Sequence, residues 1–403
     1  MLKVKTMVLK VVTELLKRFL TCTFIILFCC EYLIYNIVIY QCSWPLLKQQ
    51  GSFRNGEFID KSQNVKALLL SDPHLLGSQH GHWFDKLRRE WQMKKSFQTA
   101  MNYFQPEVVF ILGDIFDEGM ICDDEEWQQY VVRFHDIFYR TNDVQLFVVP
   151  GNHDIGFHYR MTGKSQLSKR FEKDFNVTGV NLLNLKGNVF VLLNSMALEQ
   201  DGCALCEKAE QELKQVSSQL KCLHKDKLMF NFWRKQCVLA PFMSDPVLLQ
   251  HFPLYRSSEV NCTGRDSPPL ERRYIENREG WEVLSQSASE LLMTSLQPRA
   301  IFGGHTHHSC QVLHQGNIPE FTLPSFSWRN RNDPSFLMAT FNPNAYSVGR
   351  CFLPEENTVI FLYISLGFCS LFYIFWNSFR RKFYRSQLYR TRIFDHREPV
   401  KIC

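Results

Sequence analysis

The chain has 403 residues, a formal net charge of +6 and 14 cysteines. This length exceeds that of one typical domain and fits a large α/β domain with additional segments. The positive charge is concentrated at the two ends of the chain, while residues 19–379 carry a net negative charge. A basic surface for nucleic acid is therefore not expected.

Two apolar stretches, residues 19–40 and 358–379, are each long enough to cross a bilayer. A cleaved signal peptide is the alternative for the first, but its apolar part is too long and no A-x-A-like cleavage site follows. The sequence thus predicts two transmembrane helices. Basic residues dominate residues 1–18 and 380–403, which predicts cytoplasmic tails and a lumenal location for residues 41–357.

Two polar residues, Glu31 and Asn36, interrupt the first apolar stretch. Such side chains are costly in lipid. They indicate either a partner on a neighbouring helix or a position near the membrane interface.

The part between the apolar stretches has features of an oxidising compartment. Asn176 and Asn261 lie in glycosylation sequons. Nine cysteines are present, at positions 42, 122, 203, 206, 222, 237, 262, 310 and 351. Cys203-x-x-Cys206 with two later cysteines could bind zinc, but an oxidising lumen favours disulfides. Because nine is odd, one thiol is expected to be free or paired between chains.

The predicted lumenal part begins with a polar stem, residues 41–64, and continues with a catalytic domain, residues 65–343. In that domain short apolar runs alternate with helical patterns, which predicts an α/β fold with strands buried on both faces. Residues 344–357 are expected to link the domain to the second span. Residues 203–246 and 261–280 are expected to be insertions.

Five predicted strand ends carry residues that can bind metals. They are Asp72 with His74, Asp114 with Asp117, Asn152 with His153, His251, and His305 with His307. In α/β sheets, ligands gather beyond the carboxyl ends of strands. This mixture of carboxylate, imidazole and amide suits Mn, Fe or Zn, and it is large enough for two ions.

The blocks SDPH, GDIFD, PGNHD, a later His251 and GGHTH resemble, in order, the motifs of the calcineurin-like metallophosphoesterase superfamily. The resemblance implies an α/β, four-layer αββα sandwich with a site for two divalent metal ions. It implies that Asp114 bridges the two ions and that hydroxide attacks phosphorus in line. The other ligands implied are Asp72, His74 and His307 for the first ion, and Asn152, His251 and His305 for the second.

The same resemblance implies catalytic roles for two residues that do not bind metal. His153 would contact the phosphoryl oxygens and assist the leaving group, and Asp154 would orient His153. Asp117 is expected to support a ligand or cap a helix, and His308 to be incidental. Gln250, before His251, departs from the Gly common in the superfamily and could narrow the approach to the metal.

Other histidines, His80, His82, His135 and His158, are expected on the surface or near the substrate. Of these, His82 and His158 are expected nearest the site.

Outside the metal blocks, residues 81–93 and 323–336 resemble the branch of this superfamily that remodels glycosylphosphatidylinositol (GPI) anchors. That resemblance implies a phosphodiesterase that removes ethanolamine phosphate from the second mannose, with Mn²⁺ as the metal. It implies GPI-anchored proteins as substrates and cargo receptors of ER export as partners. The implied location runs from ER exit sites through the ER–Golgi intermediate compartment to the Golgi. Trp83, Trp328, Arg329 and Arg331 could contact mannose or phosphate, although both tryptophans could equally be packing residues.

Three alternatives use the same residues. A related lumenal phosphodiesterase could act on another mannose-linked ethanolamine phosphate or on a lipid diester. A non-catalytic metal-binding scaffold is disfavoured because every expected ligand and His153 are present. A nuclease is disfavoured by the predicted topology and the acidic lumenal part.

Overall fold

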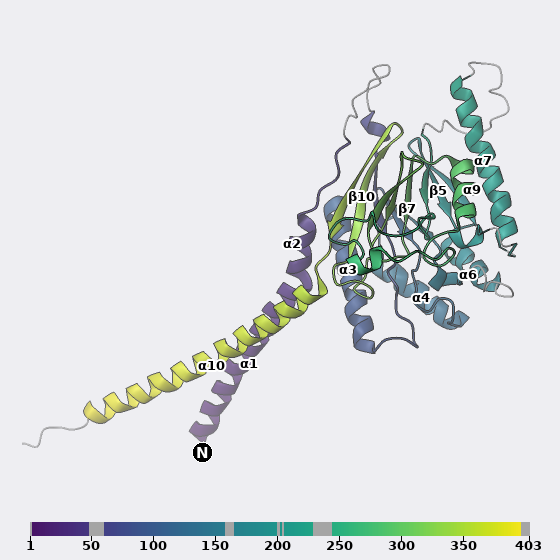
Figure 1. Cartoon of the computed structure of the whole chain (residues 1–403). Coiled ribbons are helices and arrows are strands. Elements are labelled where there is room, and N and C mark those ends of the chain that lie inside the picture. Colours follow the sequence, from purple (N-terminus) through teal and green to yellow (C-terminus); the bar gives the residue numbers. More distant parts are fainter. Residues whose placement is uncertain are drawn as a thin grey trace, which may run out of the picture. The chain divides into compact units, whose positions relative to one another are not determined.

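The computed structural model describes residues 2–47, 60–157, 165–199, 202–203, 205–228 and 244–395. The chain forms two compact units: Met1–Ile37 with Pro354–Cys403, and Val38–Leu353. Elements are labelled in Figure 1. The predicted residue His158 lies outside the described residues, as do Cys237 and half of the predicted stem.

The first unit consists of long apolar helices. Helix α1, Leu2–Phe28, continues through a π-helical turn, Cys29–Leu33, into α2, Ile34–Tyr40. Near the C-terminus, α10 spans Glu356–Asp395. Leu9–Tyr40 and Glu356–Tyr384 are long and apolar enough to cross a membrane. Both helices extend beyond the predicted spans, because the basic flanking residues are good helix formers.

Glu31 has a partner on the other apolar helix, because the hydroxyl of Tyr363 donates a hydrogen bond to its carboxylate. This contact agrees with the first of the two explanations for a carboxylate in the span. The side chain of Asn36 donates to the carbonyl of Tyr32, 2.8 Å away, within its own helix.

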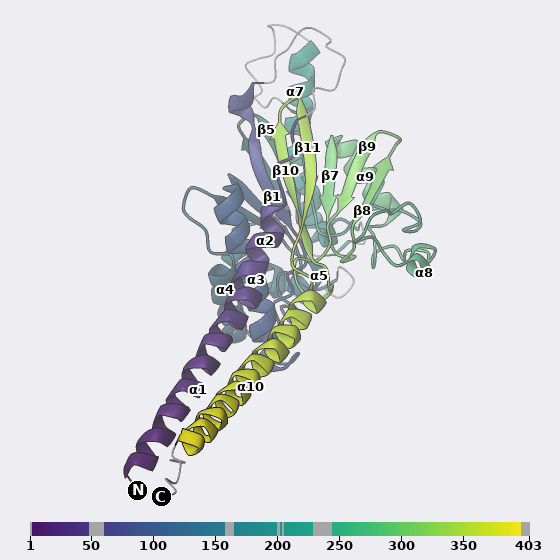
Figure 2. The same cartoon turned by 90° about the vertical axis from the view of Figure 1, so that its left-hand side faces the viewer.

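The second unit contains two mixed sheets, which confirms the predicted α/β fold (Figure 2). The first sheet has the order β11-β10-β1-β2-β3, with β1, β2 and β3 parallel. Its strands are β1 Val65–Leu70, β2 Val108–Leu112, β3 Gln145–Val149, β10 Ser335–Asn342 and β11 Ala345–Phe352.

The second sheet has the order β4-β5-β6-β7-β9-β8, and its inner strands β5, β6, β7 and β9 are parallel. Its strands are β4 Val180–Leu185, β5 Asn188–Leu193, β6 Val247–Leu249, β7 Ala300–Gly303, β8 Cys310–His314 and β9 Ile318–Thr322.

Helices cover the outer faces of both sheets (Figures 1 and 2). Helix α3 packs with α4, and α7 packs with α9 and β4. The helices of this unit are α3 Trp83–Phe104, α4 Asp124–Ile137, α5 Asn152–Ile155, α6 Ser165–Phe175, α7 Cys206–Leu228, α8 Leu270–Arg273 and α9 Gln286–Leu296.

The apolar strand residues divide between two cores. Val108 and Phe110 of β2 face the other sheet, where the ring of Phe110 lies 5.2 Å from that of Phe190 on β5. Val109 and Ile111 face the outer helices. Since β2 is buried on both faces, its sequence is a continuous apolar run rather than an alternating one.

Residues 344–357 are not the linker that the sequence predicted. Ala345–Phe352 forms β11, which pairs with β10 along its full length, from Asn342 opposite Ala345 to Ser335 opposite Phe352. Its side chains are mostly half-buried, so the strand has no strong apolar signal. The predicted stem also differs, because Trp44 packs on the core and its indole N–H donates to the carbonyl of Phe104.

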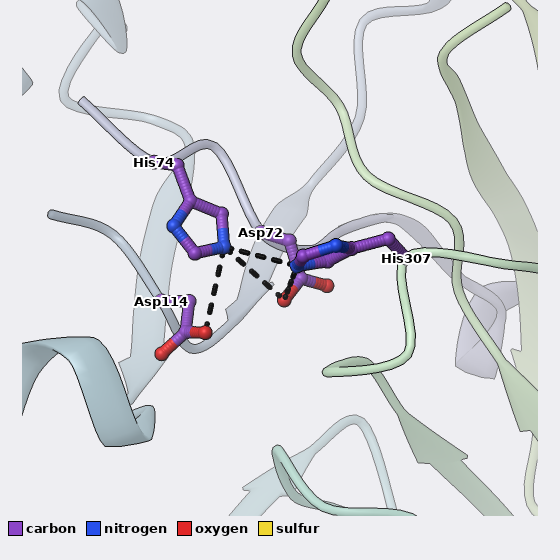
Figure 3. Close-up of side chains that lie close together, drawn as sticks. All are labelled: Asp72, His74, Asp114 and His307. Atoms are coloured by element: carbon purple, nitrogen blue, oxygen red, sulfur yellow. Dashed lines mark hydrogen bonds and ion pairs between the residues drawn. The ribbon is translucent and has the colours of Figure 1, made fainter. Parts of the chain in front are cut away.

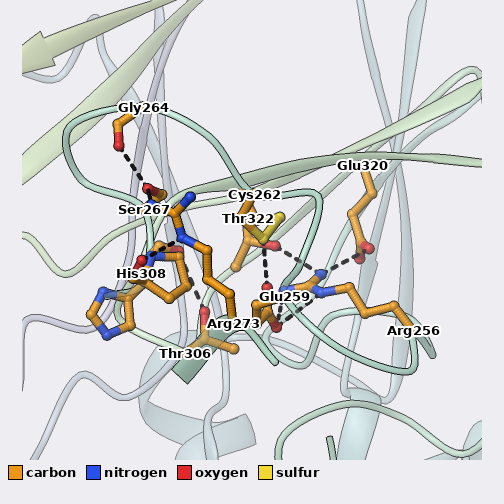
Figure 4. The surroundings of a disulfide bond; sticks show 12 residues. Arg256, Glu259, Cys262, Gly264, Ser267, Arg273, Thr306, His308, Glu320 and Thr322 are labelled. Atoms are coloured by element: carbon orange, nitrogen blue, oxygen red, sulfur yellow. Dashed lines mark hydrogen bonds and ion pairs between the residues drawn. A yellow bond between two sulfur atoms is a disulfide. The ribbon is translucent and has the colours of Figure 1, made fainter. Parts of the chain in front are cut away.

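Within the described parts of the chain, three disulfides join Cys42 with Cys351, Cys203 with Cys206, and Cys262 with Cys310. Because Cys203 and Cys206 are joined to each other, neither is a free thiolate for the alternative zinc site. The third anchors the 261–280 insertion beside a buried cluster of Arg256, Glu259 and Glu320 (Figure 4). Cys122 is buried and free, in line with the odd number of cysteines. Asn176 and Asn261 are exposed, so both sequons are accessible.

We expect Cys351→Ser to lower the free energy of unfolding by about 2–5 kcal/mol, because the Cys42–Cys351 bond closes a very long loop. The control is Cys203→Ser with Cys206→Ser, which opens a loop of only three residues. Thermal unfolding of the detergent-solubilised chain measures both. Equal destabilisation by the two changes would contradict this prediction.

Candidate metal centre

The residues predicted to bind metal meet at one edge of the two sheets. Asp72 and His74 follow β1, and Asp114 follows β2. Asn152 begins α5 after β3, His251 follows β6, and His305 and His307 follow β7. The loops are joined by backbone hydrogen bonds, including Asp72 N–H to Gly113 O and Gly304 N–H to His251 O.

The loops at this edge have strained backbones. Asp72, His74, Asp114, His305 and His307 all have positive φ angles, between 47° and 71°. A non-glycine residue adopts this conformation at a cost, and such residues cluster at functional sites. Five of the predicted ligands have this backbone conformation. The fold therefore brings their side chains together at a cost in conformational energy of the backbone.

Gly151 is required for the close approach of two of these loops. A Cβ atom at Gly151 would collide with the backbone nitrogen and the carboxylate of Asp114. The glycine of the PGNHD block therefore lets α5 begin directly against the carboxylate that is expected to bridge the metals.

The first donor group contains Asp72, His74, Asp114 and His307 (Figure 3). Nε2 of His74 lies 3.4 Å from Oδ2 of Asp114, 3.9 Å from Oδ1 of Asp72 and 3.1 Å from Nε2 of His307. Nδ1 of His74 donates to Asp117 Oδ1, 3.1 Å away, which leaves a lone pair on Nε2. Asp117 thus supports a predicted ligand, as expected from the sequence.

The second group contains Asp114, His251 and His305, with Asn152 beside them. Nδ1 of His251 donates to the carbonyl of Leu112, so its Nε2 faces Asp114 Oδ2 at 3.4 Å and Asn152 Oδ1 at 3.2 Å. His305 donates from Nε2 to Trp281 O, and its buried Nδ1 has no hydrogen-bond partner among the described residues.

These contacts fit two divalent cations. The opposite ring nitrogens of His74 and His251 donate elsewhere, so the facing nitrogens become acceptors when they lose their protons. Acceptors held within about 3–4 Å of one another need a cation or a proton between them. Asp114 Oδ2 lies 3.4 Å from both His74 and His251, one in each group, which is the position of a bridging ligand.

The electrostatics favour charged groups at the centre. Burial would raise the pKa of Asp114, but His251, His153 and His74 lower it well below its usual value. Burial would lower the pKa of His251, whereas Asp114 raises it to about 9. Burial and the neighbouring His251 lower the pKa of His305 to about 3, so this imidazole is neutral and able to bind a metal.

His153 lies at the mouth of the centre. Its backbone N–H donates to Asp114 Oδ1 at 2.8 Å, and its ring lies 4.7 Å from that of His74. Nδ1 of His153 donates to the carbonyl of Asp117, which leaves Nε2 for a substrate. The backbone of Asp117 therefore orients this imidazole.

Asp154 is bonded to the backbone, and its predicted effect on His153 would act through these bonds. Its carboxylate accepts hydrogen bonds from the backbone N–H groups of Ile115, Phe116 and Gly151. It fastens the loop after β2 to the start of α5, so it positions Asp114 and His153 through the backbone. Burial and the charge of Asp114 raise the pKa of Asp154 to about 7, although the three hydrogen bonds lower it.

Several residues that the sequence analysis singled out make structural contacts. Trp328 is 5% exposed and packs under Arg88, so it is a packing residue. Arg331 is bound by Asp333 and donates to His307 O. His82 caps α3 by accepting from Phe84 N–H. Gln250 is fully buried and does not line an open approach.

Two residues of this neighbourhood, His80 and Asn330, were ranked low or missed. His80 lies 3.9 Å from Asp117 Oδ2, closer to the centre than the sequence analysis expected. Nδ2 of Asn330 lies 3.4 Å from His307 Nε2. An asparagine in a polar loop resembles any turn residue, and only the fold brings it to the metal ligands. The candidate Arg329 lies 3.5 Å from Asp117 Oδ2.

The sequence model described as "Calcineurin-like phosphoesterase" matches residues 65–309. This chain belongs to the calcineurin-like phosphoesterases. "Metallophosphoesterase 1" of Ailuropoda melanoleuca is 50% identical over 341 residues, covering 84% of this chain and 84% of that protein. "Metallophosphoesterase 1" of Xenopus laevis is 49% identical over 351 residues, covering 84% and 83%.

Among solved structures, a dimetal phosphatase from Danio rerio aligns with a TM-score of 0.38 and 13% identity. It covers 72% of this chain and 99% of that chain, and a similarity this low adds nothing to the assignment. The family and the donor groups together identify a metal-dependent phosphoesterase.

Asp114→Asn is expected to lower the metal content of the purified phosphoesterase below that of wild type. The amide keeps an acceptor for His153 N–H but loses the charge between the two donor groups. Activity should fall by more than the about 100-fold that outer partners of metal ligands cost. Metal analysis with a small phosphodiester assay tests both, with the exposed Asp143→Asn as the control. Unchanged metal content would contradict the bridging position.

Metal affinity should rise with pH. In the metal-free phosphoesterase, His251 is protonated below about pH 9, and a metal must displace that proton. The apparent affinity for Mn²⁺ is therefore expected to increase about tenfold per pH unit between roughly pH 7 and 8. The raised pKa also means that His251 stabilises the metal-free fold below its usual value of 6.5, and this contribution is lost as the pH rises through about 9. Calorimetric titration measures the affinity, and a pH-independent value would contradict the prediction.

Proposed function

We propose that this phosphoesterase is a dinuclear phosphodiesterase that removes the ethanolamine-phosphate side branch from the second mannose of GPI anchors. The observation that carries the diesterase chemistry is the pair of donor groups that share Asp114, with His153 beside them. The resemblance of residues 81–93 and 323–336 to GPI-remodelling phosphoesterases supports the substrate.

Bound divalent ions would supply an activated water and would neutralise charge on the phosphoryl oxygens. The residues Asp72, His74 and His307 would hold one ion, and Asn152, His251 and His305 the other. His153 presents Nε2 to the substrate because Asp117 O binds its Nδ1. From there it can donate a hydrogen bond to a phosphoryl oxygen or a proton to the departing alkoxide.

Contacts of the 323–336 stretch also support a role in substrate binding. Asn330 and Arg331 both contact His307, and Arg329 contacts Asp117. Arg329 is 38% exposed at its side chain, so its guanidinium can reach a phosphate or a sugar hydroxyl.

The candidate spans and the disulfides support a lumenal enzyme of the early secretory pathway. Disulfides persist in the oxidising lumen rather than the cytosol. On this proposal Mn²⁺ is the metal, GPI-anchored proteins are the substrates, and cargo receptors of ER export are partners.

The test is mass spectrometry of GPI glycans from cells that lack the protein and receive wild type or His153→Gln. We expect ethanolamine phosphate to stay on the second mannose without the protein, and wild type to remove it. His153→Gln should retain metal but turn over about 10²–10⁴-fold more slowly.

If the glycans are the same with and without the protein, the GPI substrate is wrong. If the branch accumulates on a different mannose, the enzyme acts on another mannose-linked ethanolamine phosphate.

A further inference from the structure

The first turns of α3 present an apolar, aromatic stripe to solvent. The stripe consists of Trp83, Phe84, Leu87 and Trp91, which are 66%, 53%, 57% and 40% exposed. Positions 83, 87 and 91 are four residues apart, so they lie on one face of the helix. A contiguous apolar surface of this kind marks an interaction site.

Cationic side chains accompany the stripe. Nζ of Lys95 lies 5.1 Å from the ring centre of Trp91, and Lys86 lies in the same turns. Tryptophan, phenylalanine and leucine beside lysine form the composition of helices that lie in the interface of a bilayer. The aromatic rings enter the headgroup region, and the ammonium groups attract anionic lipids.

The other end of α3 lies where the chain leaves the first candidate span. The ring of Tyr103 contacts that of Tyr40, the last residue of the span Leu9–Tyr40, at 5.5 Å. Trp44 donates to Phe104 O, and the Cys42–Cys351 disulfide holds the exit toward the second span at the same edge. The stripe begins about 20–30 Å along the helix from this point, so it lies on the helix whose other end is next to the entry of the chain into this unit.

The stripe is also coupled to the metal centre. Gln92, fully buried on α3, donates to Phe326 O and accepts from Trp328 N–H. The same loop carries Asn330, whose amide lies 3.4 Å from His307 Nε2. A bilayer against the stripe would therefore be held at a fixed position relative to the metal ligands.

We propose that Trp83, Phe84, Leu87 and Trp91 form a lipid-docking surface that aligns the metal centre with phosphoesters carried on the bilayer. The inference rests on the membrane attachment in the proposed function, but not on the GPI glycan as substrate. It identifies the partner as a lipid surface, and a protein partner is one outcome of the test.

The first experiment places the photoreactive residue p-benzoylphenylalanine at position 83 of the full chain in nanodiscs of phosphatidylcholine and phosphatidylserine. The control is the same residue at position 139, where Tyr139 is 67% exposed. We expect lipid adducts from position 83 and none from position 139, read by mass spectrometry. Equal lipid adducts at both positions, or adducts to protein alone at position 83, would overturn the proposal.

The second experiment measures kinetics of Phe84→Asp with Leu87→Asp. Phe84 lies in the first turn of α3, where an aspartate favours the helix, so the fold is expected to persist. The KM for a lipid-anchored phosphodiester in the nanodiscs should rise about tenfold, while kcat/KM for a water-soluble diester stays unchanged. Val132→Asp, at a position 69% exposed on α4, is the matched control and should alter neither.

Equal loss on the lipid-anchored and soluble substrates, or no loss on either, would contradict lipid docking. The two proposals can fail separately. Lipid adducts at position 83 together with unchanged GPI glycans would leave the docking surface standing and remove the GPI substrate.

Discussion

The carboxylate of Asp114 is the contact on which the rest of the centre depends. One of its oxygens lies 3.4 Å from imidazoles of two separate donor groups, and the other accepts the backbone N–H of His153. Asp114 follows β2, the strand between β1 and β3 in the first sheet. A strand with neighbours on both sides therefore leads into the residue that both metals would share.

Placing charged groups at a buried edge is costly, and the surrounding structure compensates in identifiable ways. Asp72 and Asp114 are almost fully buried, and burial alone would favour their neutral forms. His74 and His251 offset this cost by lying beside them, and each imidazole is fixed through its second nitrogen by Asp117 or Leu112. Metal binding at this site would therefore displace protons from the imidazoles.

The clustering of the predicted metal ligands could be inferred from the sequence because the chemistry restricts the residue types. Asp72, Asp114 and His251 each follow an apolar run, and the ordered blocks leave few other interpretations. Asp154 could not be assigned in the same way. Whether its carboxylate binds a ring or a backbone depends on how the loop after β2 meets α5, and only the folded chain fixes that geometry.

The burial and strand pairing of segments without a strong apolar pattern could not be predicted from the sequence either. Residues 344–357 have no continuous apolar run, because β11 lies at the edge of its sheet and is mostly half-buried. Trp328 and Trp83 are the same residue type in two stretches that resemble one branch of the family, yet one is 5% and the other 66% exposed. Local sequence does not distinguish them, since exposure of a tryptophan depends on the elements packed around it.

The two ends of the catalytic unit are held together by one covalent bond. Cys42 lies near its first residue and Cys351 near its last, and their Cα atoms are 5.5 Å apart. Both candidate spans are therefore connected to one edge of the unit, through β11 and the segment that carries Trp44. A domain with two neighbouring tethers has less freedom to rotate than a domain on one flexible linker. The disulfide thereby fixes the separation of the two points at which the chain enters and leaves this unit.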